Sequence, residues 1–230
     1  MKKILFLLFT VAAVIQLDAQ KETRILDDYD AIKVSGGISL VLHEGSPKAV
    51  IELKKGDMED LVVKVKDNTL HIKFEGNGWF GSGGNGKAHI ELYGAHNIEE
   101  LSASAGSSVN TESNISAHDF DLSVSSGALV DIDLECSDTD VSVSSGGHVK
   151  LAGKASGMDV SVSSGGGFKG VDFECKDVDA SASSGGAAKV WATHSIDASA
   201  SSGGSVKYKG NPSDKDIDVG KYSGGSVSAL

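Results

Sequence analysis

The sequence predicts an all-β fold: a single-stranded β-helix, or β-solenoid, with about 20 residues per turn. The first observation is a repeated Ser-x-Ser-Ser-Gly-Gly motif whose copies, aligned on one glycine, are spaced 18 to 21 residues apart. The second is that apolar residues occupy alternate positions before each copy, which is typical of a strand with one buried face. The third is the glycine itself, because glycine adopts positive φ at tight corners without a Cβ clash. Exact and looser copies lie at Ser102–Gly106, Ser123–Gly127, Ser142–Gly147, Ser161–Gly166, Ser181–Gly186, Ser199–Gly204 and Gly220–Gly225.

Residues 1–19 have the pattern of a secretory signal peptide. Lys2 and Lys3 precede an apolar run from Ile4 to Ile15, and Ala19 marks the expected cleavage site. The run is shorter than the roughly 20 residues that cross a bilayer, and nothing later is more apolar, so we expect no membrane span. The remaining chain is therefore expected to be exported to the periplasm, the cell surface or the medium.

Residues 20–98 lack the serine motif but contain alternating segments that predict strands. We expect them to form the first, less regular turns of the same solenoid, with a separate small β domain as the alternative. Asp67-Asn68 lies between two alternating runs and predicts a tight turn. The predicted strands are Ala31–Val34, Ile38–His43, Ala49–Lys54, Leu61–Lys66, Thr69–Phe74 and Lys87–Leu92.

A glycine-rich loop, residues 76–86, interrupts this part and carries Trp79 and Phe80. The functional hypothesis is a contact loop whose rings stack on sugars or on a partner protein. The structural alternative is that one ring covers the end of the solenoid.

Residues 99–230 are expected to form the regular turns. Counting from the aligned glycine, the inward columns narrow to alanine near Ala180 and Ala198, so we expect larger residues such as Trp191 and Tyr208 to fill the core there. Lys221 interrupts an apolar column in the last turn, which is typical of a polar C-terminal cap on a solenoid.

An acidic residue precedes the aligned glycine by six positions in every copy. Stacked carboxylates repel by roughly 1 kcal/mol per neighbour even in water, so something is expected to offset that repulsion. One hypothesis is bound Ca²⁺, with Asp140, Asp159, Asp179 and Asp197 as candidate ligands. The alternative is that the acids accept hydrogen bonds from backbone or serine and face water. The column is Glu100, Asp121, Asp140, Asp159, Asp179, Asp197 and Asp218.

Two serine columns accompany the acids and predict a flat face covered by hydroxyl groups. They are a candidate binding surface for a glycan or another surface, and serine is also simply small enough for close stacking. The candidate binding residues are Ser142, Ser144, Ser161, Ser163, Ser181 and Ser183. A lysine column, Lys150, Lys169, Lys189 and Lys207, is expected around the corner from the acids.

Charge and cysteine usage restrict the partners. The net charge of −11 does not favour nucleic acid as a partner. Cys136 and Cys175 occupy equivalent places two turns apart, so their Cα atoms should be roughly 10 Å apart, too far for a disulfide. We expect both to be buried free thiols.

The chain resembles the auto-transporter adhesin head family, the GIN-domain group of exported bacterial proteins. The resemblance lies in the leader, in Tyr29–Leu42, in Asn68–Ile72 and in Leu101–Gly106. In Gly37-Ile38-Ser39, serine stands where the family name expects asparagine. The resemblance implies a right-handed β-helix similar to pectin-lyase folds, without their catalytic residues, and a role in adhesion.

No enzyme motif accompanies this pattern. The seven histidines show no metal-ligand spacing, and a single arginine, Arg24, argues against anion clamping. We therefore expect a non-catalytic, exported binding or structural module without a cofactor, with adhesion through a flat solenoid face as its role. The alternative is a carbohydrate-active enzyme, a polysaccharide lyase or hydrolase, on a pectin-lyase-like fold. The partner is expected to be a surface ligand, glycan or protein, and self-association is left open.

Overall fold

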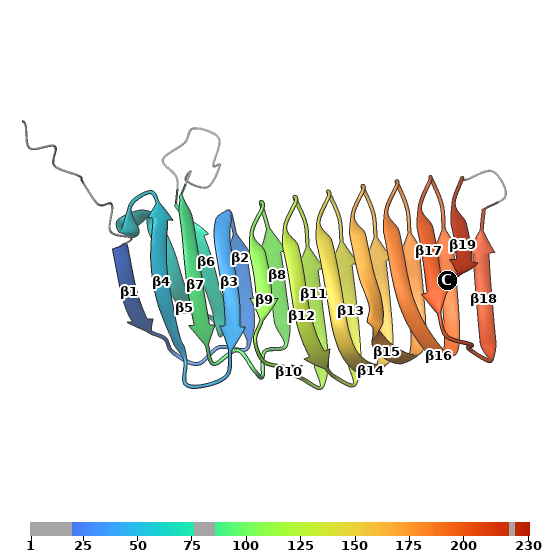
Figure 1. The fold of residues 1–230 in the computed structure, drawn as a ribbon, viewed down its shortest axis with the longest axis horizontal. Coiled ribbons are helices and arrows are strands. Elements are labelled where there is room, and N and C mark those ends of the chain that lie inside the picture. The colour runs from blue at the N-terminus through green and yellow to red at the C-terminus, as the bar shows by residue number, and fades with distance from the viewer. Residues whose placement is uncertain (1–19, 76–85, 221–223) are drawn as a thin grey trace, which may run out of the picture.

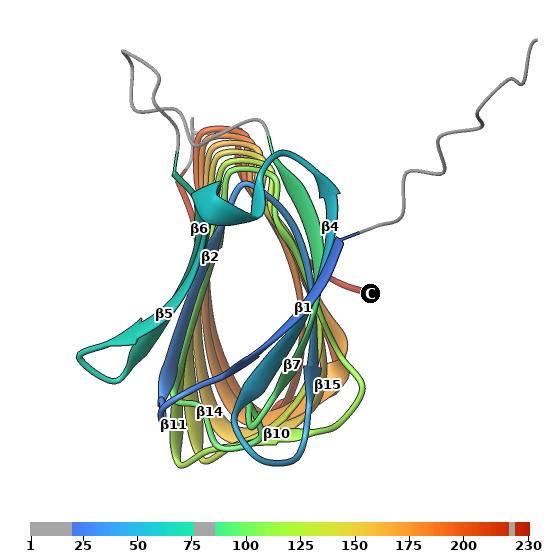
Figure 2. The ribbon, with the colours of Figure 1, turned by 90° about the vertical axis from the view of Figure 1, so that its left-hand side faces the viewer.

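The structure is a computed structural model that describes residues 20–75, 86–220 and 224–230. The predicted signal peptide, the aromatic pair Trp79 and Phe80, and Lys221 lie outside the described residues. The described part forms 19 strands in one sheet, which coils into a solenoid with two long walls joined by tight corners (Figures 1 and 2). The one helical element among these residues is a 3₁₀ turn, η1 (Met58–Asp60).

One wall, here called the serine wall, carries the serine and acid columns. From the N-terminal end it consists of β5 (Leu61–Lys66), β6 (Thr69–Phe74), β2 (Ala31–Ser35), β8 (Glu100–Ser104), β11 (Asp119–Val124), β13 (Asp138–Val143), the second halves of β14 (His148–Val162), β15 (Gly167–Ala182) and β16 (Ala187–Ala200), and β18 (Asp214–Val219).

The opposite wall, here called the lysine wall, carries the lysine column. It consists of β1 (Gln20–Ile25), β4 (Lys48–Lys55), β7 (Lys87–Tyr93), β3 (Gly37–His43), β9 (Ser108–Thr111), β12 (Leu129–Glu135), the first halves of β14, β15 and β16, then β17 (Ser205–Lys209) and β19 (Ser226–Ala229). The short strand β10 (Ile115–Ser116) pairs with the end of β12.

The regular turns stack as the motif spacing predicts. Asp140 lies on Asp159, Asp159 on Asp179 and Asp179 on Asp197, in steps of 19, 20 and 18 residues. The all-β solenoid with about 20 residues per turn is therefore confirmed. Its right-handedness stays a prediction.

The last turn differs from the sequence alignment by two residues. Asp216, not Asp218, stacks on Asp197, whereas Asp218 stacks on Ser199. The expected place of Asp218 in the acid column is thus wrong. The reason is that Gly224 follows Val219 by five positions, whereas Gly203 follows Ala200, on which Val219 stacks, by three. The alignment on the glycine therefore assigned the residues of β18 to columns that are two positions out of register.

The first turns do not follow one another in chain order. The turn made by β6 and β7 lies outermost, and the earlier turn made by β2 and β3 lies between it and the turn made by β8 and β9. Three strands that run antiparallel to their neighbours, β1, β4 and β5, complete this end, and β1 crosses it (Figure 2). Arg24 of β1 donates a hydrogen bond to the backbone oxygen of Leu61 in β5 (3.0 Å), which ties the two walls together.

The core is continuous along the axis but changes in composition. Large aliphatic side chains such as Leu70 and Ile32 are fully buried near the N-terminal end, whereas Ala180 and Ala198 fill the same column later. Phe173 is fully buried in the same core and stacks on Gly153. Tyr208 is buried as expected, but the expectation for Trp191 is wrong. It faces outward in a column with Glu174 and Lys209, because it is out of phase with the buried positions of β16.

The repeated motif forms a two-residue corner with positive φ at both central residues, as in a type I′ turn. Ser145 (φ 49°) and Gly146 (φ 72°) occupy its centre, and the amide of Gly147 donates to the oxygen of Ser144 (2.8 Å). The amide of Gly146 donates to the oxygen of Ser164 in the next corner (3.2 Å), so the corners also bond to one another. The second glycine has a separate cause, since a Cβ on Gly147 would lie 2.8 Å from the oxygen of Val124.

Both cysteines are free, as expected. Cys175 is fully buried and stacks on Ala155, whereas Cys136 is only partly buried. Burial raises the pKa of Cys136 to about 12 and that of Cys175 to about 11, so both stay protonated and unreactive near neutral pH.

The C-terminal end of the solenoid exposes apolar residues in columns that are buried in the earlier turns. Ile217 (42 % exposed) and Val219 (38 % exposed) stack on Ala198 and Ala200, which are 0 % and 3 % exposed. The described part of the last turn thus presents a cross-section of the core to solvent.

Within the described residues we find no helix of the length and apolarity that crossing a membrane would require.

Candidate binding face

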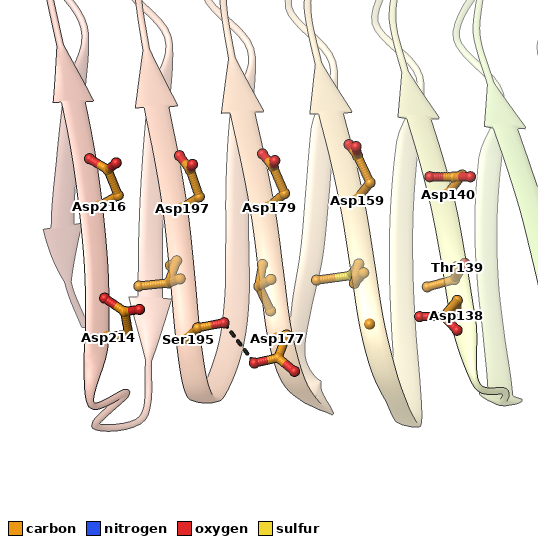
Figure 3. A pocket seen from close by; sticks show the side chains of 14 residues that line it. Asp138, Thr139, Asp140, Asp159, Asp177, Asp179, Ser195, Asp197, Asp214 and Asp216 are labelled. Carbon is orange, nitrogen blue, oxygen red and sulfur yellow. Dashed lines mark hydrogen bonds between the residues drawn. The ribbon is translucent and has the colours of Figure 1, made fainter.

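A shallow groove of about 490 Å³ runs along the serine wall and is lined by the acid column. Asp140, Asp159, Asp179, Asp197 and Asp216 come from five successive strands, and their carboxylates form a row across the wall (Figure 3). Period-two alternation places these side chains outward, because the residues between them are buried. The acid column extends toward the N-terminal end through Asp121 and Glu100.

The acids in the middle of the row are held together at an electrostatic cost. The pKa of Asp159 is raised from 3.8 first by burial and then by the charge of Asp140. That of Asp179 is raised by burial and by Asp159, and that of Asp197 by burial and by its acidic neighbours. Burial and like charge both favour the protonated form of these three carboxyl groups, so the row disfavours its own ionisation.

A second, interrupted acid column lines the same groove two residues earlier in each strand. Asp138, Asp177 and Asp214 alternate with Gly157 and Ser195. Sequence reasoning missed this column because its members are not continuous. Counting eight residues back from each aligned glycine would have found Asp138 and Asp177.

Asp177 in this second column is well supported. Ser195 Oγ donates to its Oδ1 at 2.6 Å (Figure 3). His194 Nδ1 lies 2.7 Å from the same oxygen. These hydrogen bonds lower the pKa of Asp177, with Ser195 as the largest cause. Gly157 leaves room for the Asp138 carboxylate, since a Cβ there would collide with Asp138 Oδ1.

The described residues contain no group of three His, Cys, Asp or Glu side chains placed to share a metal ion. A flat row offers each carboxylate to solvent and not to a common centre. The calcium hypothesis for Asp140, Asp159, Asp179 and Asp197 stays a prediction.

The serine columns lie directly beside the acids. Ser142 and Ser161 are exposed and stack on one another, and Ser161 Oγ lies 3.0 Å from Ser181 Oγ in the next turn. Ser144, Ser163 and Ser183 are half-buried at the start of the corners, where their backbone oxygens accept the corner hydrogen bonds. The structure therefore brings the six predicted serines onto one wall.

The lysine wall has a different chemistry. Lys150, Lys169, Lys189 and Lys207 stack as predicted. Lys150 Nζ lies 3.0 Å from Asp131 Oδ2, an exposed pair that adds little stability. Farther along, Lys209 lies over the ring of Trp191, 3.6 Å from its centroid.

A second polar cluster, which the sequence did not indicate, bridges β3 and β7 on the lysine wall. Glu91 bonds with one oxygen to His43 and with the other to His89 (2.8 Å), and His89 Nδ1 lies 3.5 Å from Ser39 Oγ. These hydrogen bonds lower the pKa of Glu91, and the bond with His89 is the largest cause. The serine–histidine contact is longer than an activated nucleophile requires, and the ring of His43 stacks on Tyr93. The cluster joins two strands that lie 50 residues apart in sequence.

Comparison with known proteins supports the fold and gives a family. Residues 28–212 match the family described as "Putative auto-transporter adhesin, head GIN domain". Among curated proteins no match was found.

Three solved bacterial structures share the fold. A putative adhesin from Bacteroides fragilis is similar with a TM-score of 0.81 and 22% identity, over 94% of this chain and 98% of that one. A putative adhesin from Parabacteroides merdae gives 0.68 and 18%, over 92% and 96% of the two chains. A putative lipid binding protein from Parabacteroides distasonis gives 0.66 and 18%, over 93% and 97%. At these identities the similarity concerns the fold alone.

Proposed function

The chain belongs to the auto-transporter adhesin head (GIN domain) family, and from this premise we propose that it is an exported, non-catalytic adhesion module that binds through its serine wall. The ligand is a polar surface group, a glycan or a protein. The observation that carries the proposal is the continuous outward row of aspartate and serine on successive turns.

The serine wall suits repeated, weak polar contacts. Each turn presents one aspartate and one serine in the same orientation, about 4.8 Å from the next pair. A ligand with its own repeat, such as a glycan chain or an extended peptide, could contact several turns at once. Individually weak contacts then add in one binding event.

Catalysis finds less support in this arrangement. A lyase or hydrolase needs an acid and a base that converge on one reacting bond. The groove instead contains parallel rows, and within the acid row burial and like charge raise the pKa values of Asp159, Asp179 and Asp197 alike. Export is supported by the leader-like residues 1–19 and by the adhesin family, and the loop with Trp79 and Phe80 stays a second candidate contact.

A glycan and cell-surface binding array tests the proposal. The test variant Ser142→Arg/Ser161→Arg adds two bulky cations to the exposed serine column. The matched control Ala187→Arg/Ser226→Arg adds the same two groups at exposed, outward positions of the lysine wall. A third arm, Trp79→Ala/Phe80→Ala, tests the loop.

The proposal predicts that the wild type and the lysine-wall control bind the same array features and that the serine-wall variant loses them. Equal binding by both arginine variants would contradict the serine wall as the contact surface. Loss in the loop variant alone would transfer the contact to Trp79 and Phe80.

A further inference from the structure

The C-terminal end of the serine wall is an unfinished edge. Within the described residues β18 pairs only with β16, so the other side of its backbone has no neighbouring strand. All six residues of β18 are exposed, including the inward-directed Ile217 and Val219. An unpaired edge with exposed apolar residues is a template for another strand.

The charged side chains on the outward face of this edge are all acidic. Asp214, Asp216 and Asp218 alternate with Lys215, Ile217 and Val219, so the outward face of β18 carries only carboxylates. The other strand at this end, β19, contains no charged residue.

The N-terminal end of the same wall has the opposite pattern. There β5 is the outermost strand and pairs, within the described residues, only with β6. Its inward residues are apolar, with Val63 buried and Val65 half-buried, and its outward residues include the exposed Lys64 and Lys66. The start of the strand is already engaged, because Arg24 bonds to the oxygen of Leu61.

The strand directions allow the two edges to pair. All strands from β6 to β18 along the serine wall are parallel, and β5 is antiparallel to β6. If a second copy is placed on the same axis, its β5 is therefore antiparallel to β18 of the first. Antiparallel pairing sets outward residues opposite outward residues and inward opposite inward.

We propose that copies of this protein associate head to tail, with the edge of β18 in one copy pairing antiparallel with the edge of β5 in the next. One register matches both faces and avoids Leu61. The four cross-strand pairs are Val63 with Val219, Lys64 with Asp218, Val65 with Ile217, and Lys66 with Asp216.

Charge favours this arrangement over a pair of C-terminal ends. Two β18 strands facing one another would set aspartates against aspartates, and like charges directly opposite destabilise a strand pair. In the head-to-tail register each outward aspartate of the pairs faces a lysine. Lys66 lies 3.9 Å from Asp67, but both side chains are largely exposed, so Lys66 can turn to a new partner. Because this interface uses two different surfaces, it leaves one of each unoccupied and extends into a linear assembly.

The test uses sedimentation velocity over a range of protein concentrations, at low and at high salt. One variant, Lys64→Asp/Lys66→Asp, makes the β5 edge acidic, and the other, Asp216→Lys/Asp218→Lys, makes the β18 edge basic. A control, Lys169→Asp/Lys189→Asp, reverses two exposed charges in the middle of the lysine wall. Circular dichroism melts establish that each variant is folded, since all the changed side chains are exposed.

We expect the wild type and the control to form assemblies that grow with concentration and shrink with salt. Each edge variant alone should self-associate about tenfold more weakly or worse, because like charges then meet at every junction. An equimolar mixture of the two edge variants should assemble again, since each then meets the opposite charge on the other. The proposal is overturned if the wild type stays monomeric at all concentrations, if either edge variant assembles like the wild type, or if the mixture does not assemble.

Discussion

The regular turns from β8 to β17 and the N-terminal part from β1 to β7 reach the same solenoid by different means. In the regular turns each strand pairs with its equivalent one motif later, so residues at the same motif position stack. In the N-terminal part the turn of β2 and β3 lies between turns that follow it in the sequence, and antiparallel strands close the end.

This difference shows what holds each part together. The regular turns depend on close stacking of small residues in the alanine column and at the corners, where larger side chains would collide with the neighbouring turn. The N-terminal part depends on large aliphatic side chains and on contacts between distant segments, such as Arg24 with Leu61. Substitutions that remove volume or add a methyl group should therefore affect the two parts differently.

The largest effect is expected at one of the largest fully buried side chains of the regular turns, Phe173. Phe173→Ala removes a fully buried ring and leaves a cavity in the core. We expect a loss of about 3 to 5 kcal/mol in the free energy of unfolding, measured by urea denaturation. Trp191→Ala is the matched control, because that ring lies outside under Lys209. A loss for Trp191→Ala as large as for Phe173→Ala would contradict the assignment of the core.

The next largest effect is expected at the second glycine of the motif. Gly186 is compared with the residue at the same motif position in an earlier turn. In Gly186→Ala the new Cβ would lie 2.5 Å from the oxygen of Val162, and backbone must move to relieve the contact. We expect a destabilisation of about 2 to 3 kcal/mol in urea denaturation.

Ala128 supplies the comparison for that glycine, since it already occupies the equivalent position as a fully buried residue. Ala128→Gly should cost only about 0.5 to 1 kcal/mol, the entropy of the added glycine. If Gly186→Ala were neutral, close stacking would not be the reason for the second glycine.

A smaller effect concerns the two kinds of tight turn. Ser164 adopts φ 49°, a conformation that serine disfavours, whereas the β5–β6 turn places Asn68 at φ 58°. Ser164→Asn should stabilise the protein by about 0.5 to 1 kcal/mol, because asparagine tolerates this region better. The reverse change, Asn68→Ser, should destabilise it, and thermal melts of both variants check the sign. Destabilisation by Ser164→Asn would mean that the serine hydroxyl at the corner contributes more than the backbone preference.

Repeats made the solenoid predictable and also set the limit of the prediction. The columns through Asp140 and Ser142 follow directly from the motif, because equal spacing fixes which residues stack. In the N-terminal part alternation predicted the strands of β2 to β7, but their spatial order depends on pairings between distant segments that leave no period. The same holds for the cluster of Ser39, His89 and Glu91, which unites residues from two strands with no shared motif.

The errors in the regular part have local causes. Trp191 was expected inside because of its size, although alternation with Val190 and Ala192 places it outside. The position of Asp218 was shifted because the sequence has two more residues between Val219 and Gly224 than between Ala200 and Gly203. Volume and motif alignment were less reliable guides than the inward–outward phase of each strand.

The smallest expected effect compares an aspartate of the acid row, Asp179, with the ion-paired Asp131 on the other wall. Asp179→Asn removes one charge from a row in which burial and Asp159 raise the pKa of Asp179 above 3.8. We expect a gain of about 0.5 kcal/mol at pH 7, because exposed like-charge contacts are weak. Asp131→Asn is the control: it breaks the pair with Lys150 and should cause a slight loss instead.

The pH dependence of Asp179→Asn follows from the direction of the shift. A carboxyl whose pKa is higher in the folded than in the unfolded state binds its proton more tightly when folded, so its ionisation destabilises the fold above both pKa values. The penalty is lifted as the pH falls through the raised pKa and then below 3.8, so the advantage of Asp179→Asn over the wild type should vanish by about pH 3. Urea denaturation of both proteins across this range measures the difference. An advantage that grew on acidification would show that Asp179 is stabilised as a carboxylate, and the row would then need a cation or donor that offsets its charge.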